Sequence, residues 1–163
     1  MLPAALAWGL VEALARRGVM ACGLGARDTL WLEGGILLYG HELTKQVDPF
    51  QGGLAGHVDL NKDFIGKDAL LRRRGHSDLP VRMGLIGDGR RAAREGDELC
   101  DSIGTVVGKV TSGTVSPTRG VPVSMGFVKL DMAEPGTGLS AMVRGRPEPV
   151  RVVSLPFYKR LAR

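Results

Sequence analysis

The stretch CGLGARDTLWLEGG, residues 22 to 35, holds the side chains best suited to binding a charged ligand. Arg27 and Asp28 lie at the start of an expected helix, where the helix dipole favours the negative charge of Asp28. Arg27 has two interpretations. It forms an ordinary surface pair with Asp28, or its planar guanidinium donates two parallel hydrogen bonds to a ligand carboxylate. Residue spacing alone does not decide between them.

The glycines of this stretch raise the question of a phosphate-binding loop. A dinucleotide fingerprint needs glycine at its first, third and sixth positions, after a strand and before a helix. Gly23 and Gly25 fit, but Asp28 occupies the sixth position and the preceding segment has a helical pattern. The chain has no P-loop pattern either. The sequence therefore disfavours phosphate binding at this loop.

Other polar residues offer little catalytic chemistry. His41, His57 and His76 have no acidic residue or cysteine at metal-ligand spacing, so we expect no metal site and treat them as turn or surface residues. Ser112, Ser116 and Thr118 lie in VTSGTVSPTRG without a nucleophile elbow or a paired base. We expect a turn there, with the hydroxyl groups satisfying backbone groups.

Composition limits the possible partners. The 163 residues are 44% hydrophobic, and 22 Lys and Arg against 17 Asp and Glu give a net charge of +5. That charge suits an anionic ligand or partner. We expect no nucleic acid, because the few aromatic residues do not alternate with basic ones. The apolar start lacks a basic leader and is interrupted by Glu12, so we expect no membrane span and a cytoplasmic location. The two cysteines, far apart, are expected to be buried or idle.

The first half of the chain predicts helices. Apolar residues at helical spacing predict an amphipathic helix from Leu2 to Arg17. Residues 24–38 fit a helix or a strand, and we favour a helix to about Glu33, ended by Gly34 and Gly35. A short strand is expected near residues 56–60 and a helix over residues 66–74.

The second half predicts a β domain, with its boundary at residues 75–79. Short β-rich runs follow one another from Leu79 onward, separated by Gly, Pro, Asp and Ser. Five or six such strands indicate a small antiparallel barrel or sandwich. The first 75 residues offer too few elements for a core of their own, so they are expected to belong to a larger domain. The runs are VRMGLI, IGTVVGKVTSG, VPVSMGFVKL, LSAMVRG and PVRVVSLPF.

Several segments together resemble one family, the aminomethyltransferase or T-protein of the glycine cleavage system. They are GLGARDTLWLEGGILLYGHEL, DFIGKDALLRRRG, VRMGLIGDGRRAAREGDEL, GKVTSGTVSPTRGVPVSMGFV and LPFYKR. The resemblance implies an α+β chain: residues 1–77 would form the tail of the folate-binding α/β domain, and residues 78–163 a C-terminal antiparallel β-barrel.

The resemblance also implies a reaction. T-proteins take an aminomethyl group from the lipoyl arm of the glycine cleavage H-protein, release ammonia and pass the one-carbon unit to tetrahydrofolate. The family's orienting aspartate and its TGEDG-like glutamate have no counterpart in this chain. We therefore expect no catalytic residue, and activity only in a truncated or partner-dependent form, with a separate N-terminal chain as one possible partner.

One folate contact carries over, since the arginine of the GLGARD motif is Arg27. Arg82 also matches a family arginine and is expected to tie the barrel to the rest of the chain, and Tyr158 is a further candidate beside the folate cleft. Two departures stand out: the family usually has arginine at Trp31 and alanine at Gly34. A second glycine is expected to loosen the helix end by roughly 1 kcal/mol.

The alternatives to a T-protein function are a non-catalytic folate- or anion-binding module, a folate-dependent demethylating enzyme, or an iron-sulfur assembly protein of the same fold.

Overall fold

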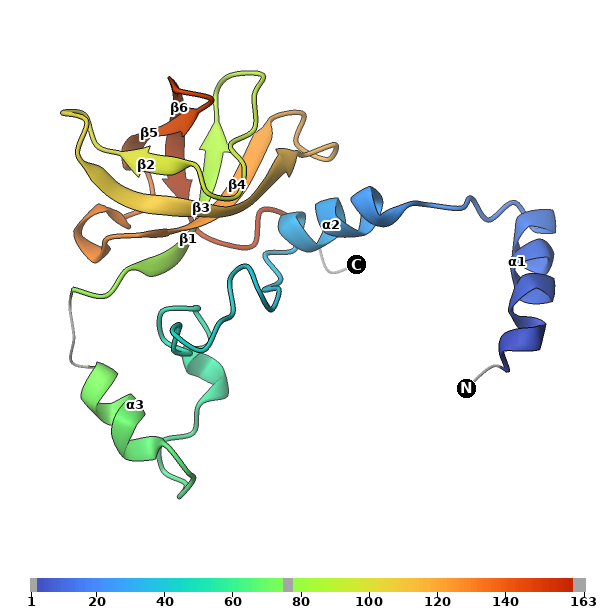
Figure 1. The fold of residues 1–163 in the computed structure, drawn as a ribbon, viewed down its shortest axis with the longest axis horizontal. Helices are drawn as coiled ribbons and strands as arrows, with labels where there is room; N and C mark the ends of the chain where they lie inside the picture. Colours follow the sequence, from blue (N-terminus) through green and yellow to red (C-terminus); the bar gives the residue numbers. More distant parts are fainter. Residues whose placement is uncertain (1–2, 75–77, 160–163) are drawn as a thin grey trace.

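A computed structural model describes residues 3–74 and 78–159 of the chain. Its largest unit is a closed barrel of six antiparallel strands in the order β1-β4-β3-β2-β5-β6 (Figure 1). A one-turn 3-10 helix, η3 (Leu130–Met132), follows β4. The strands are β1 (Val81–Gly87), β2 (Glu98–Cys100), β3 (Val106–Val115), β4 (Pro122–Val128), β5 (Gly138–Val143) and β6 (Arg146–Val153).

The barrel closes because β1 pairs on both of its edges. Leu85 lies opposite Ser124 of β4 on one side and Val152 of β6 on the other. Alternate residues of each strand then point inward, as Leu139 and Ala141 do on β5. The barrel interior is apolar and filled by side chains. Its buried residues are Leu85, Ala93, Leu99, Val107, Val110, Val128, Leu139, Ala141, Val143, Val150 and Val152.

The predicted small antiparallel barrel is confirmed, with one strand that the sequence pattern did not show. β2 contains only three residues and begins with an exposed Glu98, so it forms no β-rich run. It is nevertheless needed for closure, because it pairs with β3 on one edge and β5 on the other.

Helix α2 (Leu24–Glu33) lies against the outside of the barrel. Leu32 packs with Val123, Met125 and Phe157, which explains why β4 is buried on both of its faces. The helix ends as predicted: the backbone N–H of Gly35 bonds to Leu32, and Gly35 has a φ of +63° that a β-carbon would strain. Leu32 and Gly35 thus fix the direction in which the chain leaves the helix.

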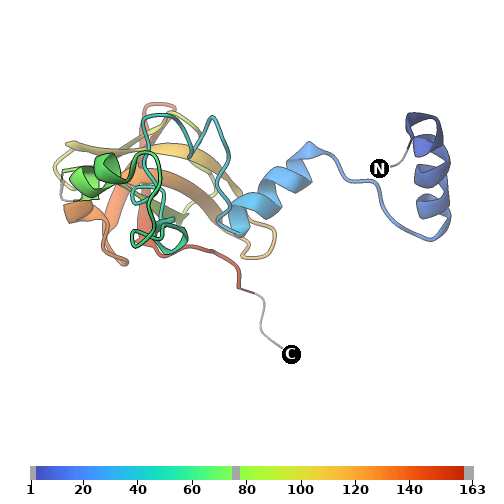
Figure 2. The same cartoon turned by 90° about the horizontal axis from the view of Figure 1, so that it is seen from below.

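Helix α1 (Ala7–Arg16), preceded by the 3-10 turn η1 (Ala4–Leu6), confirms the predicted N-terminal helix. It lies away from the barrel, joined to α2 by an extended segment (Figures 1 and 2). All its residues are exposed, including its apolar ones, with Trp8 72% exposed. No helix of the described residues is long and apolar enough to cross a membrane.

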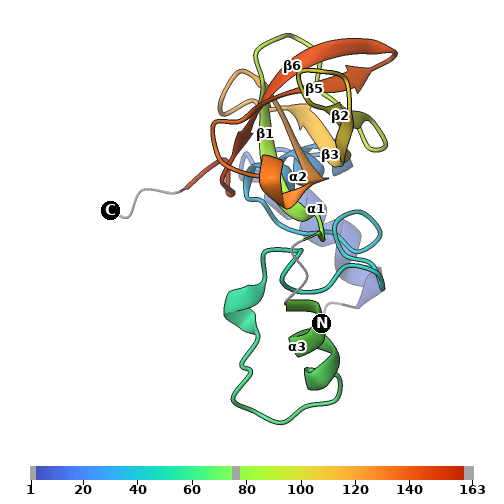
Figure 3. The same ribbon diagram turned by 90° about the vertical axis from the view of Figure 1, so that its left-hand side faces the viewer.

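Residues 36–74 form a second extension below the barrel, which ends in α3 (Lys67–Arg74) (Figures 1 and 3). The predicted helix over residues 66–74 is confirmed.

The predicted strand over residues 56–60 is wrong. Ala55–His57 forms one turn of 3-10 helix, η2, instead, and the backbone N–H of Val58 bonds locally to Ala55. A strand needs a partner for its backbone groups, and none lies beside this segment among the described residues. Residues 75–77 of the predicted boundary lie outside the described residues.

Candidate functional site

Arg27 lies on an exposed face of α2 with its guanidinium over an aromatic ring. The guanidinium carbon is 3.9 Å from the centroid of Trp31, one turn further along the helix. A guanidinium nitrogen of Arg27 is 3.8 Å from the carboxylate of Asp28, at the outer limit of an ion pair, and the Arg27 side chain is 51% exposed. Stacking leaves the N–H edges of a guanidinium free while it restricts the plane of the group. Arg27 can therefore present a flat, oriented cation to an anion.

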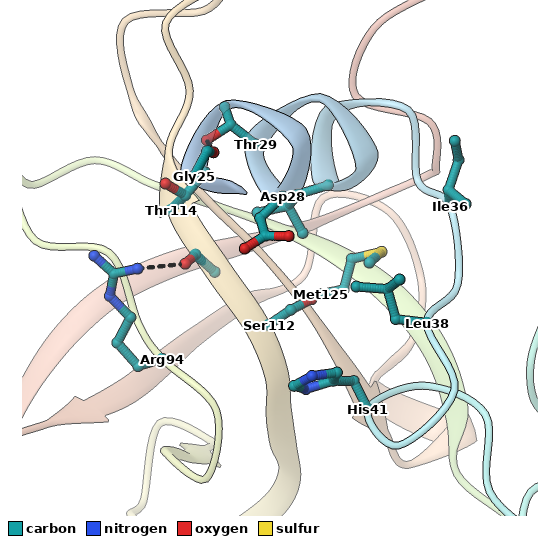
Figure 4. A pocket seen from close by; sticks show the side chains of 12 residues that line it. Gly25, Asp28, Thr29, Ile36, Leu38, His41, Arg94, Ser112, Thr114 and Met125 are labelled. Carbon is teal, nitrogen blue, oxygen red and sulfur yellow. Dashed lines mark hydrogen bonds between the residues drawn. The ribbon is translucent and has the colours of Figure 1, made fainter. Parts of the chain in front are cut away.

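A pocket of about 290 Å³ lies between α2, the loop after it and β3 (Figure 4). Leu32, Leu38 and Met125 supply apolar lining, and the polar lining includes Asp28 and His41. This mixture of an apolar floor with a few polar groups is typical of small-molecule sites. The full lining comprises Gly25, Asp28, Thr29, Leu32, Ile36, Leu38, His41, Arg94, Ser112, Gly113, Thr114 and Met125.

The stacked pair of Arg27 and Trp31 and the pocket of about 290 Å³ lie on different faces of α2. Gly25, Asp28, Thr29 and Leu32 recur at helical spacing and turn toward the barrel, where they line the pocket. Arg27 is not among the lining residues. The predicted ligand contact and the barrel-side pocket are therefore neighbours on one helix rather than parts of one cavity.

Glu33, at the end of α2, fixes the helix to the loop between β3 and β4. The hydroxyl of Ser116 donates to Glu33 Oε1, and Thr118 donates its hydroxyl at 2.7 Å to Oε2 and its backbone N–H at 3.1 Å to Oε1. Burial raises the pKa of the Glu33 carboxyl, but these hydrogen bonds together outweigh it and hold the pKa below the ordinary 4.5. The ionised carboxylate is thus the form that the fold stabilises.

A second buried carboxylate, Glu42, fixes the loop after α2 to β3. Its side chain is fully buried and accepts hydrogen bonds of 2.7 Å from the hydroxyls of both Thr111 and Ser112. The backbone N–H of Leu38 donates to its other oxygen at 3.0 Å. Because Leu38 and Ser112 also line the pocket, Glu42 holds two of its walls together.

Arg82 ties the barrel to the segments that precede it, as predicted. Its guanidinium donates to the carbonyls of Gly35 at 2.8 Å and Gly52 at 2.9 Å, and its backbone N–H donates to the carbonyl of Gln51 at 2.8 Å. Burial lowers the pKa of Arg82, and the negative charge of Glu42 raises it by a smaller amount. Its role in the described chain is structural.

Tyr158 lies at the end of the tail that follows β6. Its backbone N–H donates to the carbonyl of Glu33 at 3.0 Å, while Arg119 donates to the carbonyl of Phe157 at 2.8 Å. These bonds fix the tail beside the end of α2. The Tyr158 side chain is 50% exposed, and no hydrogen bond or ring contact joins it to Arg27 in the described chain.

The hydroxyl prediction was only partly right. Ser116 Oγ does accept the backbone N–H of Arg119 at 3.0 Å, as expected of a turn. Its own proton goes to Glu33, however, and that of Ser112 goes to Glu42. The two carboxylates lie far away in the sequence, so no local pattern indicated them.

The histidines and cysteines of the described chain form no metal site. His41 Nδ1 is 3.2 Å from the carboxylate of Glu95, and His76 lies outside the described residues. Cys100 is buried and Cys22 is exposed. Within residues 3–74 and 78–159, no group of three His, Cys, Asp or Glu side chains could hold a metal ion.

Two family models match the chain in succession. The GCVT N-terminal domain matches residues 4–62, and the glycine cleavage T-protein C-terminal barrel domain matches residues 81–159. Proteins named aminomethyltransferase are similar over almost the whole chain. That of Saccharopolyspora erythraea is 44% identical over 94% of this chain, and that of Cutibacterium acnes is 46% identical over 96%. The chain spans 42% of the length of each.

A solved structure agrees with the sequence comparisons. The glycine cleavage system aminomethyltransferase T of Bartonella henselae superposes with a TM-score of 0.86 and 35% sequence identity. The match covers 96% of this chain and 45% of that protein. The barrel, the helix placed against it and the two successive family matches lead to one conclusion: the chain belongs to the glycine cleavage T-protein (aminomethyltransferase) family and corresponds to its C-terminal part.

Proposed function

We propose that this chain takes part in glycine cleavage. In that reaction an aminomethyl group on the lipoyl arm of H-protein gives its carbon to tetrahydrofolate as the methylene bridge, and its nitrogen leaves as ammonia. The chain would supply the barrel and one wall of the tetrahydrofolate cleft. Lipoylated H-protein and tetrahydrofolate are the partners that follow from family membership.

Arg27 is the observation that carries this proposal. Folate ends in a glutamate carboxylate, and a guanidinium with free N–H edges is a suitable partner for such an anion. Trp31 keeps the Arg27 guanidinium stacked without covering those edges. In this proposal Arg27 binds and orients the folate tail and takes no part in the chemical step.

The reaction would also need the carboxylates that orient the folate and the reacting amine, and these are not found among the residues of this chain. The chain spans 42% of the length of the relatives that it matches, and it lacks the family's orienting carboxylates. We assign residues 1–77 to the tail of the folate-binding domain and residues 78–163 to the barrel domain. Activity would then depend on the remaining part of the folate-binding domain, which the complementation assay below supplies as a separate chain.

The exposed apolar side chains of α1 and α2 support this dependence. Trp8, Leu10 and Val11 are 72%, 48% and 50% exposed on α1, and Leu24 and Leu30 are 74% and 66% exposed on α2. Such a concentration of apolar surface is typical of a face that another polypeptide covers.

A complementation assay tests the proposal. The chain is mixed with the N-terminal part of the Cutibacterium acnes aminomethyltransferase, and methylene-tetrahydrofolate is measured with aminomethylated H-protein as the donor. We expect turnover from the mixture and none from either part alone. Normal turnover by the chain alone would contradict the partner dependence. A mixture that forms a complex yet binds no tetrahydrofolate would contradict the folate assignment.

A further inference from the structure

A second pocket, which we call the arginine pocket, lies on the barrel and does not include Arg27. It encloses about 410 Å³ and is bounded by the β1–β2 loop, the end of β3 and the turn between β5 and β6. Its lining comprises Arg90, Arg91, Ala92, Arg94, Asp97, Val115, Val143 and Arg144. Four arginines and one aspartate therefore line a single concave surface.

The one lining carboxylate is already engaged locally. Asp97 accepts the backbone N–H of Arg94 at 2.8 Å, and the Arg94 side chain donates to the carbonyl of Gly113 at 2.7 Å. Arg91 makes a long contact of 3.6 Å with Glu148, which is not among the lining residues. The charge that remains around the pocket is positive, so an anion that enters meets attraction from several sides.

Two of the four arginines have no partner for their charge among the residues that the structure describes. The side chains of Arg90 and Arg144 make no hydrogen bond or ion pair with any residue in the described parts of the chain. Like charges around one concave surface repel one another, and neighbouring carboxylates would be the usual means of reducing that repulsion. A bound anion would supply the missing negative charge.

The backbone at Arg144 gives an independent reason to look for a ligand. Arg144 and Gly145 form the two-residue turn between β5 and β6, and Arg144 has a φ of +51°. It is the one non-glycine residue with a positive φ among residues 3–74 and 78–159. Such turns favour glycine, asparagine or aspartate. The conformation of the turn thus does not favour arginine at position 144. Binding of an anion by its guanidinium would explain why arginine occurs there.

The pocket is shaped for a small molecule. Ala92 and Val143 are the buried residues of its lining, and its volume falls in the range of small-ligand sites rather than of a flat protein interface. Guanidinium groups pair with planar or tetrahedral oxyanions through two hydrogen bonds each. We propose that the arginine pocket binds a compact anion that carries two or more negative charges on phosphate or carboxylate groups.

Titration calorimetry at constant ionic strength tests the proposal, with tripolyphosphate and citrate as separate probes. We expect saturable binding of at least one probe to a single site, and the tighter probe identifies the preferred oxyanion. Arg144→Gly is the main variant, because glycine accepts the positive φ and the turn stays intact. Arg146→Gln is the matched control: it removes one charge from the same hairpin at an exposed position outside the pocket.

Arg144→Gly should weaken binding by about tenfold or more, the loss expected for a charge-assisted contact. Arg146→Gln and Arg27→Ala should change it by less than about twofold. Arg90→Gln, on an exposed loop, provides a second variant and should also weaken binding. The absence of saturable binding would overturn the proposal. So would equal weakening by Arg144→Gly and Arg146→Gln, because that result indicates attraction by net charge alone.

Discussion

The guanidinium carbon of Arg27 lies 3.9 Å from the centre of the Trp31 ring, with the two residues one helical turn apart on α2. Trp31 places an aromatic surface beside the Arg27 cation. The ring fixes the plane of that cation, whereas a second guanidinium at position 31 would repel it.

Replacing Trp31 should therefore weaken ligand binding without unfolding the chain. A cation–π contact at an exposed site contributes about 0.5–1 kcal/mol, so Trp31→Ala should raise the tetrahydrofolate dissociation constant by roughly two- to fivefold. Trp31→Phe should retain most of the affinity, because it keeps an aromatic ring. Ile103→Ala, at an exposed apolar position of the barrel, is the control. Tighter binding by Trp31→Ala would show that the ring blocks the site.

Glu33 should make stability fall at acidic pH. Its pKa is below 4.5 in the folded chain, so its stabilising effect is complete above that pH and is lost as the pH falls through the folded pKa. Urea unfolding should show a free energy of unfolding that decreases below about pH 4.5. Glu33→Gln should cost about 2–3 kcal/mol at neutral pH and reduce that dependence.

Exposed Glu134 provides the control for this measurement. Glu134→Gln should leave both the free energy of unfolding and its pH dependence nearly unchanged. If Glu33→Gln and Glu134→Gln gave the same acid profile, the hydrogen bonds from Ser116 and Thr118 would not be what stabilises the ionised carboxylate.

Arg82→Met should loosen the connection between the barrel and the segment from Gly35 to Gly52. The change removes two charge-assisted hydrogen bonds and leaves two carbonyls without their donor, at a cost of about 2–3 kcal/mol. Hydrogen exchange should increase in residues 36–53 more than in the barrel strands. Arg151→Met, at an exposed position on β6, is the matched control. Unchanged exchange in Arg82→Met would contradict the bridging role.

The sequence predicted the elements whose signals are local. The inward residues of β5 alternate with period two, and the glycine pair after Glu33 marks a helix end, so both could be identified from short windows. β2 could not, because a three-residue strand has too few positions to show a period. The predicted strand at residues 56–60 had a suitable composition but no partner in space.

The two glutamates that hold the site together could not be predicted from local sequence patterns. Glu42 receives its hydrogen bond from Thr111, 69 positions later, and Glu33 receives its bond from Ser116, 83 positions later. Either glutamate looks like an ordinary surface residue until the barrel brings its partner to it. Arg27, by contrast, was predicted as a ligand contact from its motif, and the structure adds that its guanidinium lies over the Trp31 ring.

The most direct test of the central claim is the Michaelis constant for tetrahydrofolate in the complemented mixture, measured with wild-type chain and with Arg27→Ala. If Arg27 binds the folate carboxylate, its loss should raise that constant by about tenfold or more, with a smaller change in the maximal rate. Arg17→Ala, which removes an exposed cation outside α2, should leave both values within about twofold. An unchanged Michaelis constant in Arg27→Ala would contradict the account.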